Sequence, residues 1–179
     1  RFLARNQITF DWVMPDDPAL ATRWSGALPA EGDYPTLRLA NGTILVRPQA
    51  RELAQLLGLQ TTARAMDFDV VVVGGGPAGL AAAVYGASEG LSTMVVEHEA
   101  PGGQAGTSSR IENYLGFPNG ISGDELASRA LRQAKRLGAD ILITRKVIRI
   151  DPHARNIFLD GGEVVRAHER ARTTGKAAR

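Results

Sequence analysis

The sequence contains no cysteine. It therefore forms no disulfide, offers no thiolate to a metal and has no thiol nucleophile. Apolar runs of the roughly 20 residues that cross a bilayer are lacking, and the first residues do not have the basic-then-apolar order of a signal peptide. The excess of one sign of charge over the other is also small: the net charge is only +2, and the basic residues are scattered until the final stretch. We expect a cytoplasmic protein with no membrane or nucleic-acid partner.

What is present is the composition of a soluble globular protein. The chain has 179 residues, of which 44% are hydrophobic and 22% charged, enough for one ordinary domain or two small ones. It begins with Arg1, in a stretch resembling the end of a helix, and closes with the polar run 169–179. We interpret the chain as a fragment of a longer protein.

The first third alternates short helical and extended patterns. Ile8–Trp12 has the apolar alternation of a half-buried strand, and Asp17 followed by Pro18 indicates the start of a short helix. Asn41–Gly42 joins two alternating runs and predicts a hairpin with a type I′ turn. A helix ending at Gly58 follows.

The second part begins with the β-branched run Val70–Val73, which is typical of a strand buried on both faces of a parallel sheet. A glycine-rich turn, an Ala-rich helix and the strand "STMVVE" complete a βαβ unit. Ser122 and Glu125 have the spacing of a capping box for a helix that stops at Gly138. The segments "ILITRKVIRI", "NIFLD" and "EVVRAH" then predict a three-stranded antiparallel meander.

The sequence "GGGPAG" fits the GxGxxG pattern of dinucleotide-binding turns. Gly74 permits the tight turn, Gly76 lets the backbone approach a pyrophosphate, and Gly79 lets the helix lie close to the sheet. Glu97 ends the next strand, where its carboxylate can accept hydrogen bonds from ribose hydroxyls. Its charge disfavours a 2′-phosphate, which leaves FAD or NAD as the ligand.

The next stretch, "PGGQAGTSSRIENYLGF", follows the second strand directly. An isoalloxazine that extends beyond the adenosine diphosphate requires a second polar loop over its ribityl chain, and an NAD site does not require that loop here. The placement therefore favours FAD.

Together, "VVVGGGPAGLAAAVYGASEGL", "VVE" and "PGGQAGTSSRIENYLGFPNGISGDELASRA" resemble the FAD domain of low-molecular-weight thioredoxin reductases, over roughly residues 69–168. The branch it looks closest to carries a thioredoxin-like segment before the reductase. The resemblance implies that Gly103 and Gln104 contact the pyrophosphate and ribityl region, Asn113 lies near the isoalloxazine, and Val147 contacts the adenine. The expected cofactor-binding residues are Gly74, Gly75, Gly76, Pro77, Ala78, Gly79, Glu97, Gly103, Gln104, Asn113 and Val147.

The segment before the glycine turn has a resemblance of its own. "YPTLRLANGTILVRPQARELAQLLGL" is similar to the C-terminal half of a thioredoxin-like or glutaredoxin-like fold, in which the X-Pro bond before the hairpin is commonly cis. From base rates we expect an ordinary trans bond at Tyr34–Pro35. The predicted α/β chain thus has four parts: a partial thioredoxin-like segment (1–58), a linker (59–68), an incomplete Rossmann-type FAD domain with a β-meander (69–168) and a polar tail (169–179).

The resemblance implies an FAD-dependent oxidoreductase that passes electrons from NADPH to a thioredoxin-like protein or a small disulfide. The CxxC pair and the NADPH domain of that family are absent from this chain, which accordingly supplies no catalytic residue and no metal ligand. The family's return strand into an ATG-type turn is also missing before Thr174 and Gly175. Two alternatives stay open: a redox-sensing docking module without turnover, and a ferredoxin-NADP reductase-like flavoenzyme. The sequence leaves a homodimer open.

Overall fold

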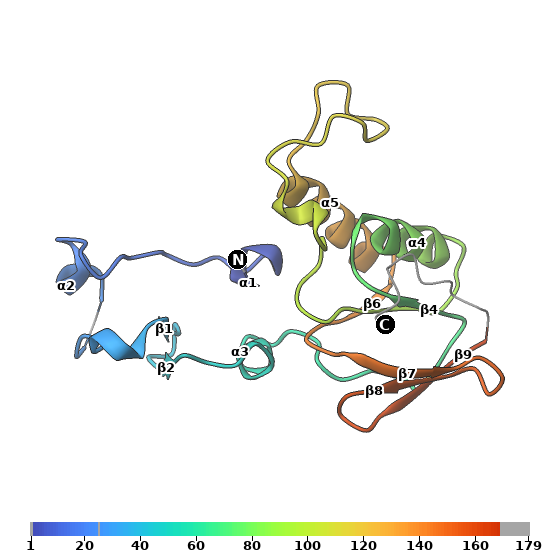
Figure 1. The fold of residues 1–179 in the computed structure, drawn as a ribbon, viewed down its shortest axis with the longest axis horizontal. Helices are drawn as coiled ribbons and strands as arrows, with labels where there is room; N and C mark the ends of the chain where they lie inside the picture. Colours follow the sequence, from blue (N-terminus) through green and yellow to red (C-terminus); the bar gives the residue numbers. More distant parts are fainter. Residues whose placement is uncertain (1, 25, 169–179) are drawn as a thin grey trace.

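The computed structural model describes residues 2–24 and 26–168 (Figure 1). The predicted tail 169–179, with Thr174 and Gly175, lies outside the described residues. In chain order the elements are α1 (Phe2–Arg5), α2 (Leu20–Arg23), the 3₁₀ turn η1 (Glu31–Asp33), β1 (Thr36–Arg38), β2 (Ile44–Val46), α3 (Ala50–Leu56), β3 (Asp67–Phe68), β4 (Val70–Val73), α4 (Pro77–Ser88), β5 (Thr93–Val96), the 3₁₀ turn η2 (Ala105–Thr107), α5 (Gly123–Arg136), β6 (Asp140–Leu142), β7 (Val147–Asp151), β8 (Asn156–Leu159) and β9 (Val164–Ala167).

A three-stranded parallel sheet, in the order β4-β5-β6, forms the middle layer. Its strands are apolar on both faces, as the β-branched run predicts. Val72, Val95 and Ile141 belong to a core cluster with residues of α4 and α5. Alternate residues such as Val71 and Met94 belong to a second cluster with strands of the meander. The sheet is thus covered by helices on one face and by a second sheet on the other (Figure 1).

The two helices begin where their capping residues predict. Gly76 is the N-cap of α4 and Pro77 occupies its first turn, where the missing N–H costs nothing. The Ser122 hydroxyl accepts a 3.2 Å hydrogen bond from the Glu125 amide at the start of α5. Beyond α5, Gly138 has φ +99°, a left-handed conformation suited to glycine. The βαβ unit and the capped helix are confirmed.

The second sheet has the order β3-β9-β8-β7. Strands β7, β8 and β9 form the predicted antiparallel meander. Strand β3 adds to its edge in parallel with β9, so the end of the stretch predicted as a linker belongs to this sheet.

The single strand expected over Ile141–Ile150 is wrong, because this stretch contains two strands in different sheets. β6 pairs with β5, whereas β7 pairs with β8. Between them, Thr144 takes φ +55°, which no strand residue adopts. The carbonyl oxygen of Thr144 accepts two hydrogen bonds from Arg51, at 3.0 Å from Nε and 2.8 Å from Nη2. The kink redirects the chain from the middle layer to the outer sheet.

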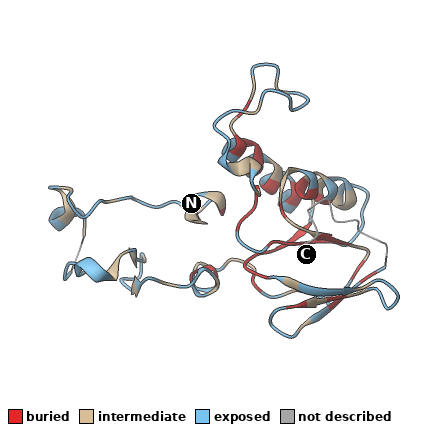
Figure 2. Ribbon diagram, viewed as in Figure 1, coloured by how far each residue is buried: buried red, intermediate tan, exposed pale blue. Residues whose placement is uncertain are grey.

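The middle of the N-terminal segment, residues 8–24 and 26–49, extends away from the layered domain and is mostly exposed, whereas α1 and α3 at its two ends contact the domain (Figures 1 and 2). The strand expected at Ile8–Trp12 is wrong: within the described residues no strand runs beside this stretch to pair with it, and Trp12 is exposed. The short helix after Asp17 is confirmed, although it begins at Leu20.

The hairpin β1–β2 is confirmed, with Thr36 opposite Val46, but its turn is not type I′. Gly42 takes φ +87°, whereas Asn41 does not have the positive φ that type I′ requires. Leu39 instead donates to the Thr43 carbonyl across a three-residue loop. The expectation for Tyr34–Pro35 is also wrong, since this bond is cis. No helix among the described residues is long and apolar enough to cross a membrane.

Candidate functional site

The glycine turn lies at the carboxyl end of β4, between the parallel sheet and α4. Gly74 has φ +101° and donates to the Val96 carbonyl at 2.9 Å. A methyl group at Gly79 would overlap the Gly74 carbonyl oxygen and stand 3.3 Å from Cγ1 of Val72. The first and third glycines therefore have the tight-turn and close-packing roles that the motif predicts.

Gly76 differs from the other two glycines. Its φ of −71° and ψ of −179° are open to any residue. A Cβ built there has no heavy atom within 4 Å among the described residues, so the position faces open space. We call this open position the cradle; it leaves room for a ligand to approach the backbone, and its use by a pyrophosphate stays a prediction.

The amides that face this cradle belong to the first turn of α4. The first N–H groups of a helix have no partner within it. Pro77 has no N–H, and Leu80 is already bonded to the Gly76 carbonyl at 2.9 Å. The amides of Ala78 and Gly79 are left as donors at the positive end of the helix dipole, an arrangement that suits an anion.

The Glu97 carboxylate lies against the same turn, with only 9% of the residue exposed. Its Oε2 accepts from the Gly75 amide at 2.6 Å and its Oε1 accepts from the Glu99 amide at 2.9 Å. Each carboxylate oxygen has a second lone pair, so both can still accept a hydroxyl. The two amides fix the carboxylate in place beside the turn.

The loop after β5 closes over the glycine turn. Gly102 donates to the Gly75 carbonyl at 2.7 Å. Gly103 has φ +53°, and a Cβ on it would stand 3.2 Å from Cα of Gly76. The structure therefore brings Gly74–Gly79, Glu97 and Gly103 together. Gln104 follows immediately and is exposed.

The other two expected residues lie apart from this group. Asn113 is exposed on a loop that projects from the domain (Figure 1). Ile111 and Ile121 pair at the base of that loop, and Leu115 near its tip is 95% exposed. Val147 begins β7, two residues after Arg145, whose amide donates to the Glu97 carbonyl at 3.1 Å. Val147 thus starts its strand near the backbone of Glu97.

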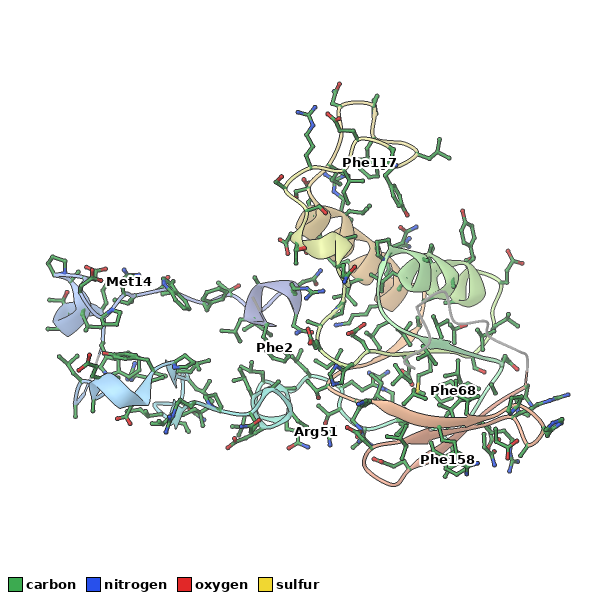
Figure 3. All side chains as sticks on the ribbon, viewed as in Figure 1. Phe2, Met14, Arg51, Phe68, Phe117 and Phe158 are labelled. Atoms are coloured by element: carbon green, nitrogen blue, oxygen red, sulfur yellow. The ribbon has the colours of Figure 1, made fainter. Side chains whose placement is uncertain are left out.

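An ion network around the buried Arg145 was not predicted from the sequence. Arg145, only 4% exposed in its side chain, is paired with Glu163 and, at 3.0 Å, with Asp160. Asp160 also pairs with Arg51 of α3, a residue labelled in Figure 3. The hydrogen bonds that Arg145 donates to the Glu163 carboxylate hold the pKa of Arg145 above its usual range despite burial, and Arg145 in turn lowers the pKa of Glu163. These partners are distant in sequence, so no local pattern identifies them.

A cavity of about 260 Å³ lies among α5, β6 and the N-terminal segment, lined in part by Asn6, Gln60, Pro101 and Lys135. Burial lowers the pKa of Lys135 there. No residue of the glycine turn lines it, so it is separate from the site described above.

A parallel strand, a glycine turn with free helix amides and a fixed acidic residue after the next strand define a dinucleotide-binding domain of the Rossmann type. Helices cover one face of its parallel sheet and a β-meander covers the other, and this arrangement further restricts the class of protein. Residues 68–174 match the pyridine nucleotide-disulphide oxidoreductase family, and the chain belongs to that family.

Two curated relatives that the chain matches are thioredoxin reductases. One from Ureaplasma parvum is 47% identical over 75 residues, covering 42% of this chain and 24% of the relative. One from Bacillus subtilis is 44% identical over 73 residues, covering 41% of this chain and 23% of the relative. A solved thioredoxin reductase from Gloeobacter violaceus superposes with a TM-score of 0.52 at 31% identity, over 57% of this chain and 33% of that one. The chain spans about a quarter of the length of the curated relatives it matches.

Proposed function

We propose that residues 69–168 bind FAD and form the FAD-binding part of an NADPH-dependent oxidoreductase of thioredoxin-disulfide reductase type. Strand β3 extends this domain back to Asp67, because it pairs with β9. In the same proposal residues 1–58 are a thioredoxin-like segment, and the residues between them connect the two parts.

One observation carries the proposal: the loop after β5 closes onto the cradle at Gly76. The contact of Gly103 with Gly76 and the bond from Gly102 to Gly75 join two loops at one point. A pyrophosphate seated on the α4 amides would lie where both loops meet. This arrangement fits a dinucleotide that continues beyond its pyrophosphate under the loop after β5. FAD is such a ligand.

The remaining assignments follow the path of FAD from that point. Glu97 accepts from the ribose hydroxyls of the adenosine, and Val147 contacts the adenine. Gly103 and Gln104 bind the pyrophosphate and ribityl region. Asn113 contacts the isoalloxazine, which requires the projecting loop to fold over the flavin.

The chain's own residues bind and orient the cofactor, whereas the bound flavin supplies the electron-transfer chemistry. The matched relatives are thioredoxin reductases, and we extend their electron path, from NADPH to a thioredoxin disulfide, to the whole protein. A dithiol for that path would lie outside this chain, which has no cysteine.

Binding can be tested by titrating the purified chain with FAD, FMN and NADH and following flavin fluorescence and absorbance. We expect FAD to bind more tightly than either alternative, because it alone occupies both loops. Comparable binding of FAD and NADH would contradict the assignment of the second loop, and a chain that cannot be loaded with FAD would refute the proposal.

Activity is tested separately. The loaded chain should be reduced by dithionite but should not reduce thioredoxin with NADPH, since its sequence contains no dithiol. Thioredoxin reduction by this chain alone would contradict the proposal that this chain binds the cofactor while a dithiol outside it reduces the disulfide.

A further inference from the structure

Helix α1 lies against the layered domain, although it belongs to the N-terminal segment. Phe2 packs on the core cluster between the parallel sheet and its helices (Figure 3). Asn6 is 5% exposed, and Gln7 donates to the Ser128 carbonyl of α5 at 2.8 Å. Arg5 lies in the chain between Phe2 and these two residues, so the contacts on both sides fix its position.

The Arg5 guanidinium holds the loop that closes over the glycine turn. Its Nε donates to the Pro101 carbonyl at 3.0 Å and its Nη2 donates to the Gly103 carbonyl at 2.8 Å. Arginine presents its donors in a rigid planar fork, so one side chain can bridge two carbonyls. Two fixed carbonyls determine the course of the loop between them.

Each of these peptide groups has its N–H on the side opposite its carbonyl, because the bonds are trans. The Pro101 carbonyl faces Arg5 while the adjoining Gly102 amide donates to Gly75 at 2.7 Å. In the same way, the Gly103 carbonyl on Arg5 directs the Gln104 amide away from Arg5. Arg5 therefore acts on the orientation of the Gly102 amide, which meets the glycine turn, and of the Gln104 amide next to it.

The loop is confined on its other side as well. A Cβ on Gly102 would stand 2.8 Å from Cβ of Ala127 on α5. The loop thus lies between α5, the glycine turn and Arg5. Removing the guanidinium leaves the first two contacts in place and frees the loop on the side of Arg5.

We propose that Arg5 is a positioning residue for the cofactor, and that docking of the N-terminal segment and binding of FAD are coupled through it. The proposal rests on the proposed FAD site. Coupling of this kind is reciprocal: FAD stabilises the docked α1, and a docked α1 raises the affinity for FAD. A partner that moves the N-terminal segment would in this way alter the affinity for the cofactor.

The test compares the wild-type chain with Arg5→Ala, Arg5→Lys and the control Arg23→Ala. Arg23 lies on α2 in the same segment, and among the described residues its ion pair is with nearby Asp17. Hydrogen exchange of residues 101–107 is measured without ligand, exchange of residues 2–8 is measured with and without FAD, and FAD affinity is measured by fluorescence titration. Circular dichroism establishes that each variant is folded.

In Arg5→Ala we expect exchange of residues 101–107 to rise about tenfold without ligand and the Kd for FAD to rise about tenfold, equivalent to about 1.4 kcal/mol. FAD should slow exchange of residues 2–8 in the wild-type chain but not in Arg5→Ala. Arg5→Lys should fall between, because an ammonium cannot span both carbonyls. Arg23→Ala should match the wild type.

Unchanged loop exchange in a folded Arg5→Ala overturns the proposal whatever the FAD result, as does a Kd equal to that of the wild type. Failure of the wild-type chain to bind FAD refutes the proposed function instead. In that case the ligand-free loop exchange still decides whether Arg5 holds the loop.

Discussion

Two glycines of the same turn should respond to substitution in opposite ways. Gly76 faces open space in an unstrained conformation, whereas a methyl group at Gly79 would overlap a backbone carbonyl. Gly76→Val should therefore spare the fold and block the cofactor. Gly79→Ala should mainly destabilise the fold.

The magnitude for Gly79→Ala follows from what surrounds it. The methyl would stand 3.1 Å from the Gly74 carbonyl carbon and 3.3 Å from Val72 Cγ1, and backbone atoms cannot move aside by changing rotamer. Overpacking of this kind costs about 3 kcal/mol. Alanine recovers about 1 kcal/mol over glycine in a helix. A net loss of about 2 kcal/mol lowers Tm by about 4–8 °C in a chain of this size.

For Gly76→Val the main effect should be on binding. The weaker N-cap costs about 1 kcal/mol of stability. A side chain in the cradle separates the phosphate from the α4 amides, and losing one hydrogen bond to a charged group costs about 2 kcal/mol. The Kd for FAD should then rise about thirtyfold or more.

The assay combines thermal unfolding by circular dichroism without ligand with FAD titration at a temperature where every variant is folded. FAD binding by Gly76→Val within threefold of the wild type would refute the pyrophosphate assignment. A Gly79→Ala chain as stable as the wild type would refute the packing argument.

Three further predictions concern the loop contacts and the ion network. Glu97→Gln replaces one of two accepting oxygens by a donor, so we expect about 1–3 kcal/mol lower stability in urea unfolding and about tenfold weaker FAD binding. Glu163→Gln should cost about 2 kcal/mol in the same assay, because it breaks the pair with Arg145. The pKa of Glu163 is lowered in the fold, so its contribution is complete above the ordinary value of 4.5 and is lost as pH falls below it; the stability lost between neutral and acidic pH should therefore be larger in the wild type than in Glu163→Gln. Gly123→Ala places a methyl on the Ala105 carbonyl and should increase proteolysis of residues 101–121, whereas unchanged cleavage would contradict that contact.

Features encoded by neighbouring residues could be predicted from the sequence. The β-branched run Val70–Val73, the glycine turn and the Ser122 cap each act through residues a few positions apart, and the structure has all three as expected. The proximity of Glu97 to Gly75 could also be predicted from the sequence, because adjacent parallel strands end at the same edge of a sheet.

Other features depend on contacts distant in sequence. Thr144 has high strand propensity, but Arg51 binds its carbonyl in a left-handed conformation and splits the expected strand. Ile8–Trp12 has a strand pattern without a neighbouring strand in the described residues to complete it. In the site, Arg5 meets its partners 96 and 98 positions along the chain, a separation that local patterns do not report.

The N-terminal segment is attached to the layered domain at both of its ends, through Arg5 near its start and Arg51 near its close. The residues between these anchors form an arm whose length the domain does not fix. For a flexible arm, doubling that length costs only about 0.6 kcal/mol of closure entropy. Evolution or protein engineering can thus exchange the outer part of the arm, and with it any recognition surface, while both anchors and the glycine turn are kept.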